Sequence, residues 1–342
     1  MAKTAIISVD GHVKASRAGY RDYIQGKFLQ TYDEWVRAAE EAGIPDAGNL
    51  NPEYGADAQW DSQRRLQVLE GQGVVAEVLF PNGQPFQINR FEDAARADDV
   101  ELAGEGRQAY NRWLVDFCAE APGRRSGQAV VSFDDVDQAV KDVYWAKERG
   151  LGGIMMPPLN PGGKDFFDPV LDPIWAAVQE VGLPLSQHGG AGLPGYSAPG
   201  FAAILTVSIE NGFFSVRSLW QMIAGGVFDR FPGLRMASVE MGSDWVRELL
   251  RKLKKSFGQA PGAYREDPVE TFRRHVWVSP FHEEDLRGMA DLVGVERMLM
   301  GSDFPHAEGI AVPGDYVHEL KGFSPREIRL VMRENALALA AR

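Results

Sequence analysis

The chain has 342 residues, of which 44% are hydrophobic, and it carries a formal net charge of −12. This length can bury a large core, and without a long apolar run or a signal-peptide pattern the sequence predicts a cytoplasmic protein with no membrane span. Lys and Arg are scattered along the sequence, so neither nucleic acid nor an anionic membrane is an expected partner. Cys118 is the only cysteine, which excludes an intramolecular disulfide and a thiol-only metal site.

Short apolar runs alternate with longer segments of helical periodicity. Strands are predicted at residues 4–9, 74–80, 126–132, 153–156, 183–187, 234–239, 276–279 and 297–300. Helices are predicted at residues 93–118, 136–149, 174–181, 208–224, 244–257, 283–292 and 325–341. No glycine-rich phosphate loop follows a strand to favour an open nucleotide-binding sheet. The sequence therefore predicts an α/β fold of the (β/α)8 TIM-barrel type, because such units close most economically as a barrel.

Residues 13–72 do not fit one connection between a strand and a helix, since they are rich in aromatic residues, Gly, Pro and charges. We predict a long insertion after the first strand that folds over the barrel mouth or makes a subunit contact. A second Gly- and Pro-rich stretch, residues 189–200, follows the fifth strand, where barrel loops build active sites. No linker interrupts the pattern, so residues 1–342 are predicted to form a single domain.

The predicted first strand runs into Asp10 and His12. Residues two apart at a strand end project to the same face, so both side chains can point into the barrel. A carboxylate and an imidazole are good ligands for zinc, manganese or iron. The pair alone is a weak signal, because a surface turn after a strand explains it about as well.

Two further strand ends carry similar groups. His188 closes the fifth strand, and Asp303 follows the eighth, with His306 three residues later. Taken singly, His188 could be a core histidine and Asp303 could cap a turn. Parallel strands in a closed barrel, however, bring their C-terminal ends to one mouth. Agreement among the three strand ends predicts a divalent-metal site whose ligands are Asp10, His12, His188 and Asp303.

Sequence motifs spread over nearly the whole chain are ISVDGH (7–12), AEVLFPN (76–82), LDPIW (171–175), FPGLR (231–235), EMGSDW (240–245), GSDFPHAEG (301–309) and ENA (334–336). Together they resemble the amidohydrolase-related metal-dependent hydrolases. That branch of the amidohydrolase superfamily also contains nonoxidative aromatic-acid decarboxylases. The resemblance implies that Asp10, His12, His188 and Asp303 bind the metal, and that Asp303 can exchange a proton with metal-bound water.

The end of the sixth strand departs from the pattern of that family. Its decarboxylases usually carry a catalytic histidine there, and this sequence has Glu240; their first-strand pair is commonly Glu-x-His or His-x-His. A carboxylate beside a cation stays ionised and becomes a base or an additional ligand, which argues against a simple decarboxylase. Glu240, Glu77 and His306 could hold a second metal. The alternatives are that Glu240 orients ligands and that Glu77, an acid within an apolar strand, pairs with an arginine.

Four other residues are candidates for contact with a substrate. His282 follows the seventh strand and therefore faces the barrel mouth. Trp35, Trp60 and Phe86 are candidates for the wall of a substrate pocket, with plain packing as the alternative.

The sequence favours a hydrolase of a small amide, lactone or related carbonyl compound that uses metal-activated water. Asp303 or Glu240 would take the proton, and His188 or His306 would stabilise the developing oxyanion. A first alternative is nonoxidative decarboxylation of an aromatic or unsaturated acid. The others are a dinuclear iron- or manganese-dependent oxygenase and a partner subunit that has lost turnover.

The expected cofactor is zinc, with iron or manganese as alternatives and with room for a second metal. The expected partner is a small-molecule substrate. The long insertion, the acidic surface and the family resemblance favour a homo-oligomer, or a hetero-oligomer with a related subunit.

Overall fold

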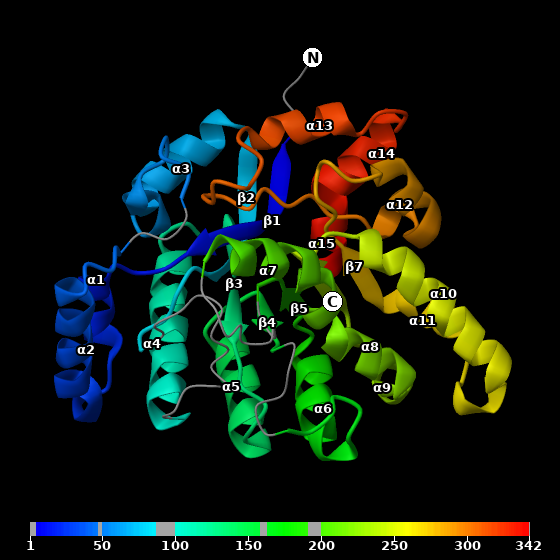
Figure 1. Cartoon of the computed structure of the whole chain (residues 1–342), viewed down its shortest axis with the longest axis horizontal. Helices are drawn as coiled ribbons and strands as arrows, with labels where there is room; N and C mark the ends of the chain where they lie inside the picture. Colours follow the sequence, from blue (N-terminus) through cyan, green and yellow to red (C-terminus); the bar gives the residue numbers. More distant parts are fainter. Residues whose placement is uncertain (1–4, 47–49, 87–99, 158–162, 191–199, 342) are drawn as a thin grey trace.

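The computed structural model describes residues 5–341 except 47–49, 87–99, 158–162 and 191–199. Seven parallel strands pair in chain order, and the sheet curls so that helices cover its outer face (Figure 1). The strands are β1 (Ile6–Val13), β2 (Val74–Pro81), β3 (Arg125–Val130), β4 (Gly153–Met155), β5 (Leu185–His188), β6 (Met236–Val239) and β7 (Val276–Val278). The predicted TIM-barrel fold is confirmed.

The segment at residues 298–304 fills the eighth position of the barrel. The amide of Leu299 donates to the carbonyl of Val278 in β7 at 2.8 Å, and the amide of Val9 in β1 donates to the carbonyl of Met300 at 2.9 Å. The segment thus bonds to both edges of the sheet, but it pairs through isolated bridges and not through a continuous ladder. The prediction of a regular eighth strand at 297–300 was therefore wrong, although the barrel closes at this place.

The helices alternate with the strands. Their bounds are α1 (Arg17–Tyr20), α2 (Leu29–Glu41), α3 (Ser62–Gly71), α4 (Val100–Ala119), α5 (Val136–Glu148), α6 (Asp172–Val181), α7 (Phe201–Phe214), α8 (Arg217–Ala224), α9 (Val227–Arg230), α10 (Asp244–Gln259), α11 (Pro268–His275), α12 (Leu286–Val293), α13 (Tyr316–Glu319), α14 (Pro325–Arg329) and α15 (Asn335–Ala340). None of the described helices is long and apolar enough to cross a membrane.

The helix predicted at 208–224 is in fact two helices, α7 and α8, and α7 begins seven residues earlier. The break has a physical cause at Ser215. Its carbonyl accepts a hydrogen bond from the side chain of Gln187 in β5, and its hydroxyl lies 2.7 Å from Oδ1 of Asn211. The side chain of Gln187 therefore occupies the carbonyl of Ser215, which a continuous helix would use for its own backbone hydrogen bond. Of the helix predicted at 93–118, residues 93–99 lie outside the described part.

The segment between α2 and α3 lies against the barrel mouth. The amide of Asn51 donates to the carbonyl of Pro305 at 2.9 Å, and Leu50 forms an antiparallel bridge with His306. Arg65 of α3 is fully buried and its Nη1 donates to the carbonyl of His12 at 3.0 Å. These contacts join the region after β1 to the strand ends that carry the candidate site.

Candidate metal centre

Asp10 and His12 lie near the end of β1 and are almost completely buried, at 4% and 2% exposure. The pairing of β1 with β2 shifts register between Ser8 and Gly11, immediately at this pair. Such irregularities change the direction in which the following side chains point and are common beside active sites. As a result, Oδ1 of Asp10 and Nδ1 of His12 lie 3.8 Å apart.

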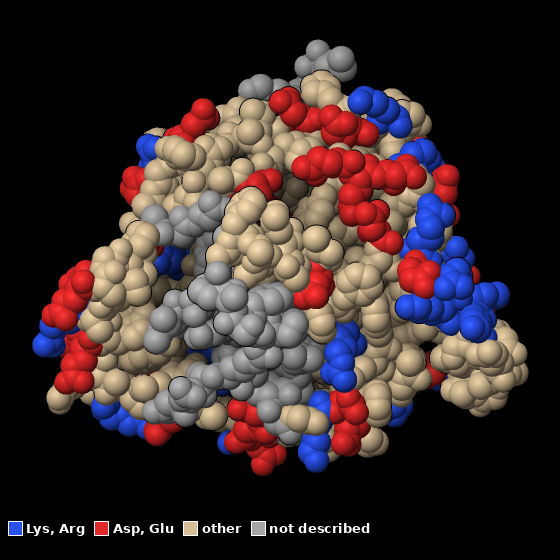
Figure 2. Space-filling model, in the orientation of Figure 1, with Lys and Arg blue, Asp and Glu red and all other residues tan. Residues whose placement is uncertain are grey.

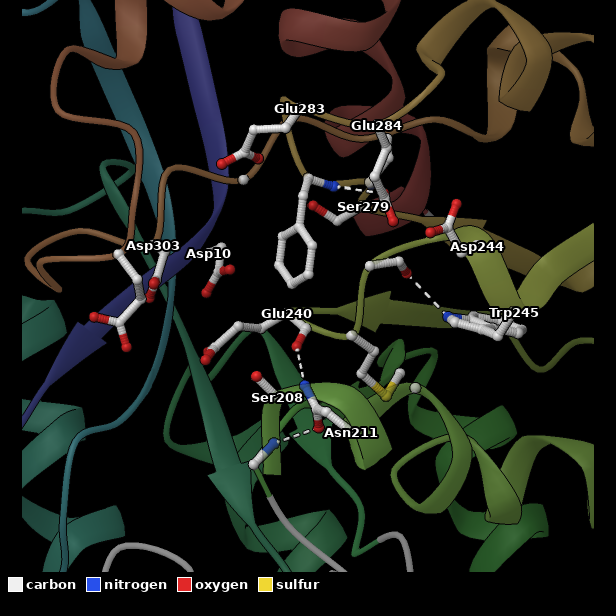
Figure 3. Close-up of a pocket in the computed structure, with 18 of the residues that line it drawn as sticks. Asp10, Ser208, Asn211, Glu240, Asp244, Trp245, Ser279, Glu283, Glu284 and Asp303 are labelled. Atoms are coloured by element: carbon white, nitrogen blue, oxygen red, sulfur yellow. Dashed lines mark hydrogen bonds between the residues drawn. The ribbon is translucent and has the colours of Figure 1, made fainter. Parts of the chain in front are cut away.

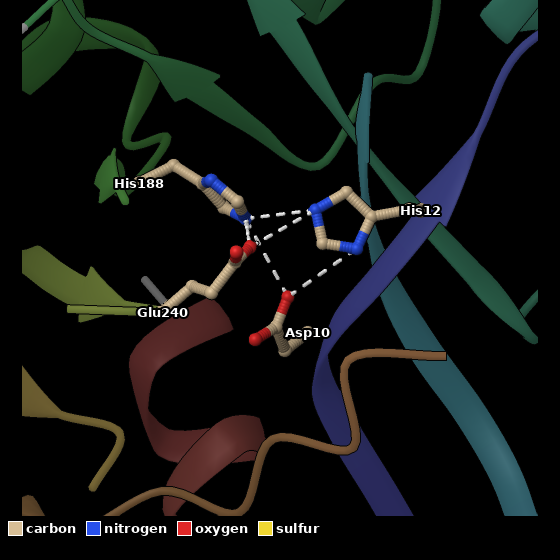
Figure 4. Close-up of side chains that lie close together, drawn as sticks. All are labelled: Asp10, His12, His188 and Glu240. Atoms are coloured by element: carbon tan, nitrogen blue, oxygen red, sulfur yellow. Dashed lines mark hydrogen bonds and ion pairs between the residues drawn. The ribbon is translucent and has the colours of Figure 1, made fainter. Parts of the chain in front are cut away.

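His188 at the end of β5 and Glu240 directly after β6 meet this pair (Figure 4). The Nε2 atoms of His188 and His12 lie 3.1 Å apart. Oε2 of Glu240 lies 2.9 Å from Nε2 of His188 and 3.2 Å from Nε2 of His12. Oδ1 of Asp10 is 3.5 Å from Nε2 of His188. The potential ligand atoms of these four residues all lie within 4.8 Å of one another.

Asp303 and His306 form a second group with His12 and Glu240, again within 4.8 Å. Oδ1 of Asp303 lies 3.0 Å from Nδ1 of His12 and 2.6 Å from Nδ1 of His306. The two groups share His12 and Glu240, so they form one continuous cluster. Asp303 thus reaches the predicted ligands through His12, whereas Glu240 takes the fourth place beside Asp10, His12 and His188.

The donor set fits a divalent cation. Oδ1 of Asp10, Nδ1 of His12 and Oε2 of Glu240 are buried and make no hydrogen bond, although neighbouring ligand atoms are close. Buried polar atoms rarely remain without a partner, because such a group loses its hydration and gains nothing in return. Nδ1 of His188 donates to the carbonyl of Gly189 at 3.0 Å, which leaves the lone pair on Nε2 free for a metal. Carboxylate and imidazole together suit zinc, manganese or iron.

The charges of the cluster act strongly on one another in the absence of a cation. Burial by itself would lower the pKa of His188, but the nearby carboxylates of Glu240 and Asp10 outweigh it and raise the pKa well above its usual value. Burial would raise the pKa of Glu240, but the imidazoles of His188 and His12 lower it well below the ordinary value. For Asp303, burial and the charge of Glu240 raise the pKa well above the usual range. The cluster therefore favours the ionised form of Glu240 and shifts Asp303 toward its protonated form.

Two of these residues have unusual backbone conformations. Glu240 has φ 55° and Asp303 has φ 57°, in the left-handed region that residues other than Gly rarely adopt. Such conformations persist where the surrounding structure holds them, and they concentrate at functional sites. At Glu240 the support is visible: its carbonyl accepts from Nδ2 of Asn211 at 2.9 Å, and a Cβ on Gly189 would lie 2.0 Å from that carbonyl oxygen.

The cluster opens into a cavity of about 1110 Å³ that Asp10, Glu240 and Asp303 help to line (Figure 3). His282 lines the same cavity, as its position after β7 predicts. Acidic side chains also gather on this face (Figure 2). Apolar parts of the lining come from α7, α10 and the segments after β6, after β7 and after residue 304, and include Phe213, Met241, Trp245, Phe281 and Ile310. The cavity is thus apolar with an acidic rim.

Four other predicted residues lie elsewhere. Trp35, Trp60 and Phe86 pack against the hydrophobic core and are not among the described residues that line the cavity. Glu77 belongs to neither ligand group, since its two oxygens each lie 2.8 Å from the guanidinium of Arg65. This is the pairing with an arginine that the sequence left as the alternative to a second metal.

Sequence reasoning missed Asn82, which contacts His306, and Gln59, which contacts Asn82. Nε2 of His306 lies 3.0 Å from Oδ1 of Asn82, and Nδ2 of Asn82 donates to Oε1 of Gln59 at 2.5 Å. Asn82 directly follows β2, so its place at a strand end was an available signal. Gln59 comes from the region between β1 and α3, and nothing in its local sequence indicates this contact.

The fold and the cluster define a barrel with a carboxylate–imidazole centre at its mouth. The chain belongs to the amidohydrolase family, whose model matches residues 84–339. This confirms the resemblance found in the sequence motifs.

Similar proteins include decarboxylases. The 2-amino-3-carboxymuconate-6-semialdehyde decarboxylase of Dictyostelium discoideum is 26% identical over 290 residues, which cover 81% of this chain and 76% of that protein. An amidohydrolase from Mycobacterium avium subsp. paratuberculosis K-10 matches the whole of both chains with a TM-score of 0.79 and 26% identity. A dihydroxybenzoic acid decarboxylase from Polaromonas sp. JS666 was solved with manganese and the inhibitor 2-nitroresorcinol. The match covers 98% of this chain and 97% of that chain with a TM-score of 0.68. Because the identity is 16%, this similarity supports the fold alone.

Proposed function

We propose that this protein is a divalent-metal-dependent nonoxidative decarboxylase of an aromatic or unsaturated carboxylic acid. The observation that carries the proposal is the buried carboxylate–imidazole cluster with a proton-sharing pair, Asp303 and His306, at its edge. Decarboxylation replaces a carboxylate by hydrogen, so it needs a cation site for the acid and a proton donor beside it. The similarity to a decarboxylase over 81% of the chain supports this choice over amide or lactone hydrolysis.

Asp10, His12 and His188 would hold the cation, with Glu240 or Asp303 completing the set. When bound, the cation would attract the substrate carboxylate and stabilise the negative charge that develops as the bond to it breaks. Manganese is the first ion to test, because the Polaromonas decarboxylase was solved with it. Zinc and iron remain alternatives on the same donor chemistry.

The proton would come from the pair formed by Asp303 and His306. When the carbon–carboxylate bond breaks, carbon dioxide leaves and the electron pair stays on the substrate carbon. The proton between Oδ1 of Asp303 and Nδ1 of His306, 2.6 Å apart, would then form the new C–H bond. Asn82 and Gln59 would hold the imidazole of His306 in place, and the apolar cavity wall would keep water from the carbanion.

The experiment loads the protein with manganese and presents hydroxybenzoates and unsaturated acids. We expect release of carbon dioxide and formation of a product in which hydrogen replaces the carboxylate of the substrate. Asp303→Asn should lose at least about 100-fold in kcat, because general acid catalysis contributes about 10²–10⁴-fold. Full activity in Asp303→Asn would refute the proposal. So would a manganese-loaded protein that converts none of the acids tested.

Hydrolysis is the second candidate, and Glu240 favours it. Its side chain is 21% exposed toward the cavity, and the flanking imidazoles keep it ionised, so it can accept a proton from water. A hydrolase would cleave amides or lactones without releasing carbon dioxide and would lose turnover in Glu240→Gln. Product analysis on both panels decides between the two reactions.

A further inference from the structure

Phe281 exposes an aromatic ring in the cavity beside the candidate metal centre. It is the third residue after β7, lines the cavity and is 43% exposed. A single exposed apolar side chain on an outer surface needs no explanation. In a cavity, however, aromatic side chains supply the apolar wall against which a ligand is buried. The ring is therefore a candidate for contact with the body of the substrate.

The backbone at Phe281 is held by two side chains from other parts of the chain. The carbonyl of Pro280 accepts from the hydroxyl of Tyr316, which is fully buried, at 3.2 Å. The amide of Phe281 itself donates to Oε2 of Glu284 at 2.9 Å. A ligand that binds against this segment loses little affinity to its ordering, because the segment is already positioned.

Glu284 also ties Phe281 to the strand end that carries Glu240. Its carboxylate accepts from the amide and from the hydroxyl of Ser243, each at 2.8 Å. A Cβ on Gly242 would lie 3.1 Å from Cδ2 and Cε2 of the Phe281 ring, so the ring packs closely on this backbone. Gly242 is two residues after Glu240, and their Cα atoms are therefore at most about 7 Å apart. The ring thus lies next to the cluster, within reach of an acid whose carboxylate binds there.

The charge of the cavity narrows the class of substrate further. Asp244, Glu283 and Glu284 line it outside the cluster (Figure 3), as do Glu248 and Glu308. In the described part of the lining, Lys252 and His282 are the only side chains that could offset this charge. Nζ of Lys252 lies 3.6 Å from Glu248, and Nδ1 of His282 lies 3.1 Å from Glu283. A second carboxylate on the substrate would therefore meet like charge, and both of these described cations already have an acidic partner.

We propose that Phe281 determines the substrate class of this cavity, which is a monocarboxylic acid with a planar, unsaturated body. The carboxylate would bind at the metal centre, and the planar body would stack on the Phe281 ring. A flat π system gains more from such a contact than a puckered aliphatic ring of similar size. The proposal rests on the proposed decarboxylase function, because it takes the metal centre as the partner of the carboxylate.

The first experiment measures binding to the manganese-loaded protein by isothermal titration. The probes are benzoate and cyclohexanecarboxylate, which carry the same carboxylate on a flat and on a puckered ring. We expect the wild type to bind benzoate about twofold to tenfold more tightly, as an aromatic pair contributes. Phe281→Leu should lose this preference and keep the wild-type affinity for manganese. Phe281→Tyr retains the ring face and should retain the preference.

The matched control is Phe167→Leu, at a phenylalanine that is 42% exposed and does not belong to the described lining of the cavity. This variant should keep the wild-type preference for benzoate. A wild type that shows no preference, or that binds neither probe, overturns the proposal, as does a preference that survives in Phe281→Leu. Loss of manganese affinity in Phe281→Leu also overturns it, because Phe281 would then support the structure of the mouth.

A second titration tests the restriction to one carboxylate. Isophthalate is benzoate with a second carboxylate, and it should bind at least about tenfold more weakly than benzoate at low ionic strength. The difference should shrink as added salt screens the acidic lining. Isophthalate that binds as tightly as benzoate overturns the proposed substrate class.

Failure of this proposal is distinguishable from failure of the proposed function. If no acid releases carbon dioxide, the decarboxylase is refuted, and the titrations still measure whether the cavity prefers a planar acid with one carboxylate. If acids are decarboxylated and Phe281→Leu leaves KM unchanged for each of them, the decarboxylase stands and the role of Phe281 is refuted.

Discussion

Individual ligand atoms at the barrel mouth depend on one another. Oδ1 of Asp10, Nδ1 of His12 and Oε2 of Glu240 have no hydrogen-bond partner, so each gains from a cation that the others help to bind. His188 contributes through Nε2 because Nδ1 is occupied by the carbonyl of Gly189. Its removal should therefore affect metal binding more than any cavity residue outside the cluster.

His188→Ala should weaken manganese binding by on the order of 100-fold or more, since loss of an outer partner alone costs about 10–100-fold. The matched control is His282→Ala, because His282 lines the same cavity and instead lies 3.1 Å from Glu283 through its Nδ1. Isothermal titration and metal analysis measure both variants. Equal affinity of His188→Ala and wild type would show that the cluster is not the metal site.

His275 makes a separate prediction about stability and pH. It is buried at the end of α11, directly before β7, and its ring stacks on that of Phe228 with the centroids 4.8 Å apart. Its Nδ1 donates to the carbonyl of Leu234 at 2.8 Å. Burial lowers the pKa of His275 below its ordinary value, so the folded state resists protonation that the unfolded state accepts. Its contribution to stability is therefore present above pH of about 6.5 and is lost as the pH falls through the folded-state pKa.

The measurement is the free energy of unfolding by urea between pH 5 and pH 8 in wild type and His275→Gln. We expect the wild type to lose stability more steeply than the variant as the pH falls below about 6.5. His318→Gln, at an exposed position, is the control and should keep the wild-type slope. Parallel curves for wild type and His275→Gln would contradict the prediction.

At the scale of elements, the ends of β5 and β6 position each other. Gly189 directly follows β5, and its amide donates to the carbonyl of Val239 in β6 at 3.0 Å. A Cβ at this glycine would lie 2.0 Å from the carbonyl oxygen of Glu240, a backbone atom that cannot turn aside. The left-handed conformation of Glu240 thus depends on a close approach that only glycine allows.

Gly189→Ala should displace Glu240 and lower both metal affinity and turnover by about tenfold or more, with a fold that remains intact by circular dichroism. Gly258→Ala in α10 is the matched control, because a Cβ there meets nothing within 4 Å and the change is expected to be neutral or slightly stabilising. Metal titration and kcat measure the effect. Wild-type metal affinity in Gly189→Ala would show that the close contact between Gly189 and Glu240 does not determine metal binding.

The same elements show how much the sequence could predict. Asp10, His12 and His188 were found because each ends a clear apolar strand, and the barrel brings strand ends together. The place of Glu240 among them depends on a left-handed backbone, which leaves no periodic signal. The start of α7 was missed for a similar reason: the apolar run at residues 201–205 hides the helical period, so the predicted helix started at residue 208.

At the scale of the molecule, the cluster joins parts of the barrel that are distant in sequence. β1, β5, the end of β6 and the closing segment at 298–304 each contribute at least one member of the cluster. The closing segment pairs with its neighbours through isolated bridges and single hydrogen bonds and forms no continuous ladder with them. A cation at the mouth would therefore tie this closing segment to three regular strands.

Metal binding should accordingly stabilise the whole chain. A ligand that binds only the folded state adds about 2.7 kcal/mol at a free concentration of 100 times its Kd, so the Tm should rise on loading and fall in chelator. The two ligand groups share His12 and Glu240, so they compete for the same atoms, and we expect one cation per chain by elemental analysis. Two redox-active ions per chain with uptake of oxygen would instead support the dinuclear oxygenase. A Tm that does not change with manganese or chelator would show that metal binding at the cluster does not stabilise the barrel. It would contradict the view that a cation completes the structure of the mouth.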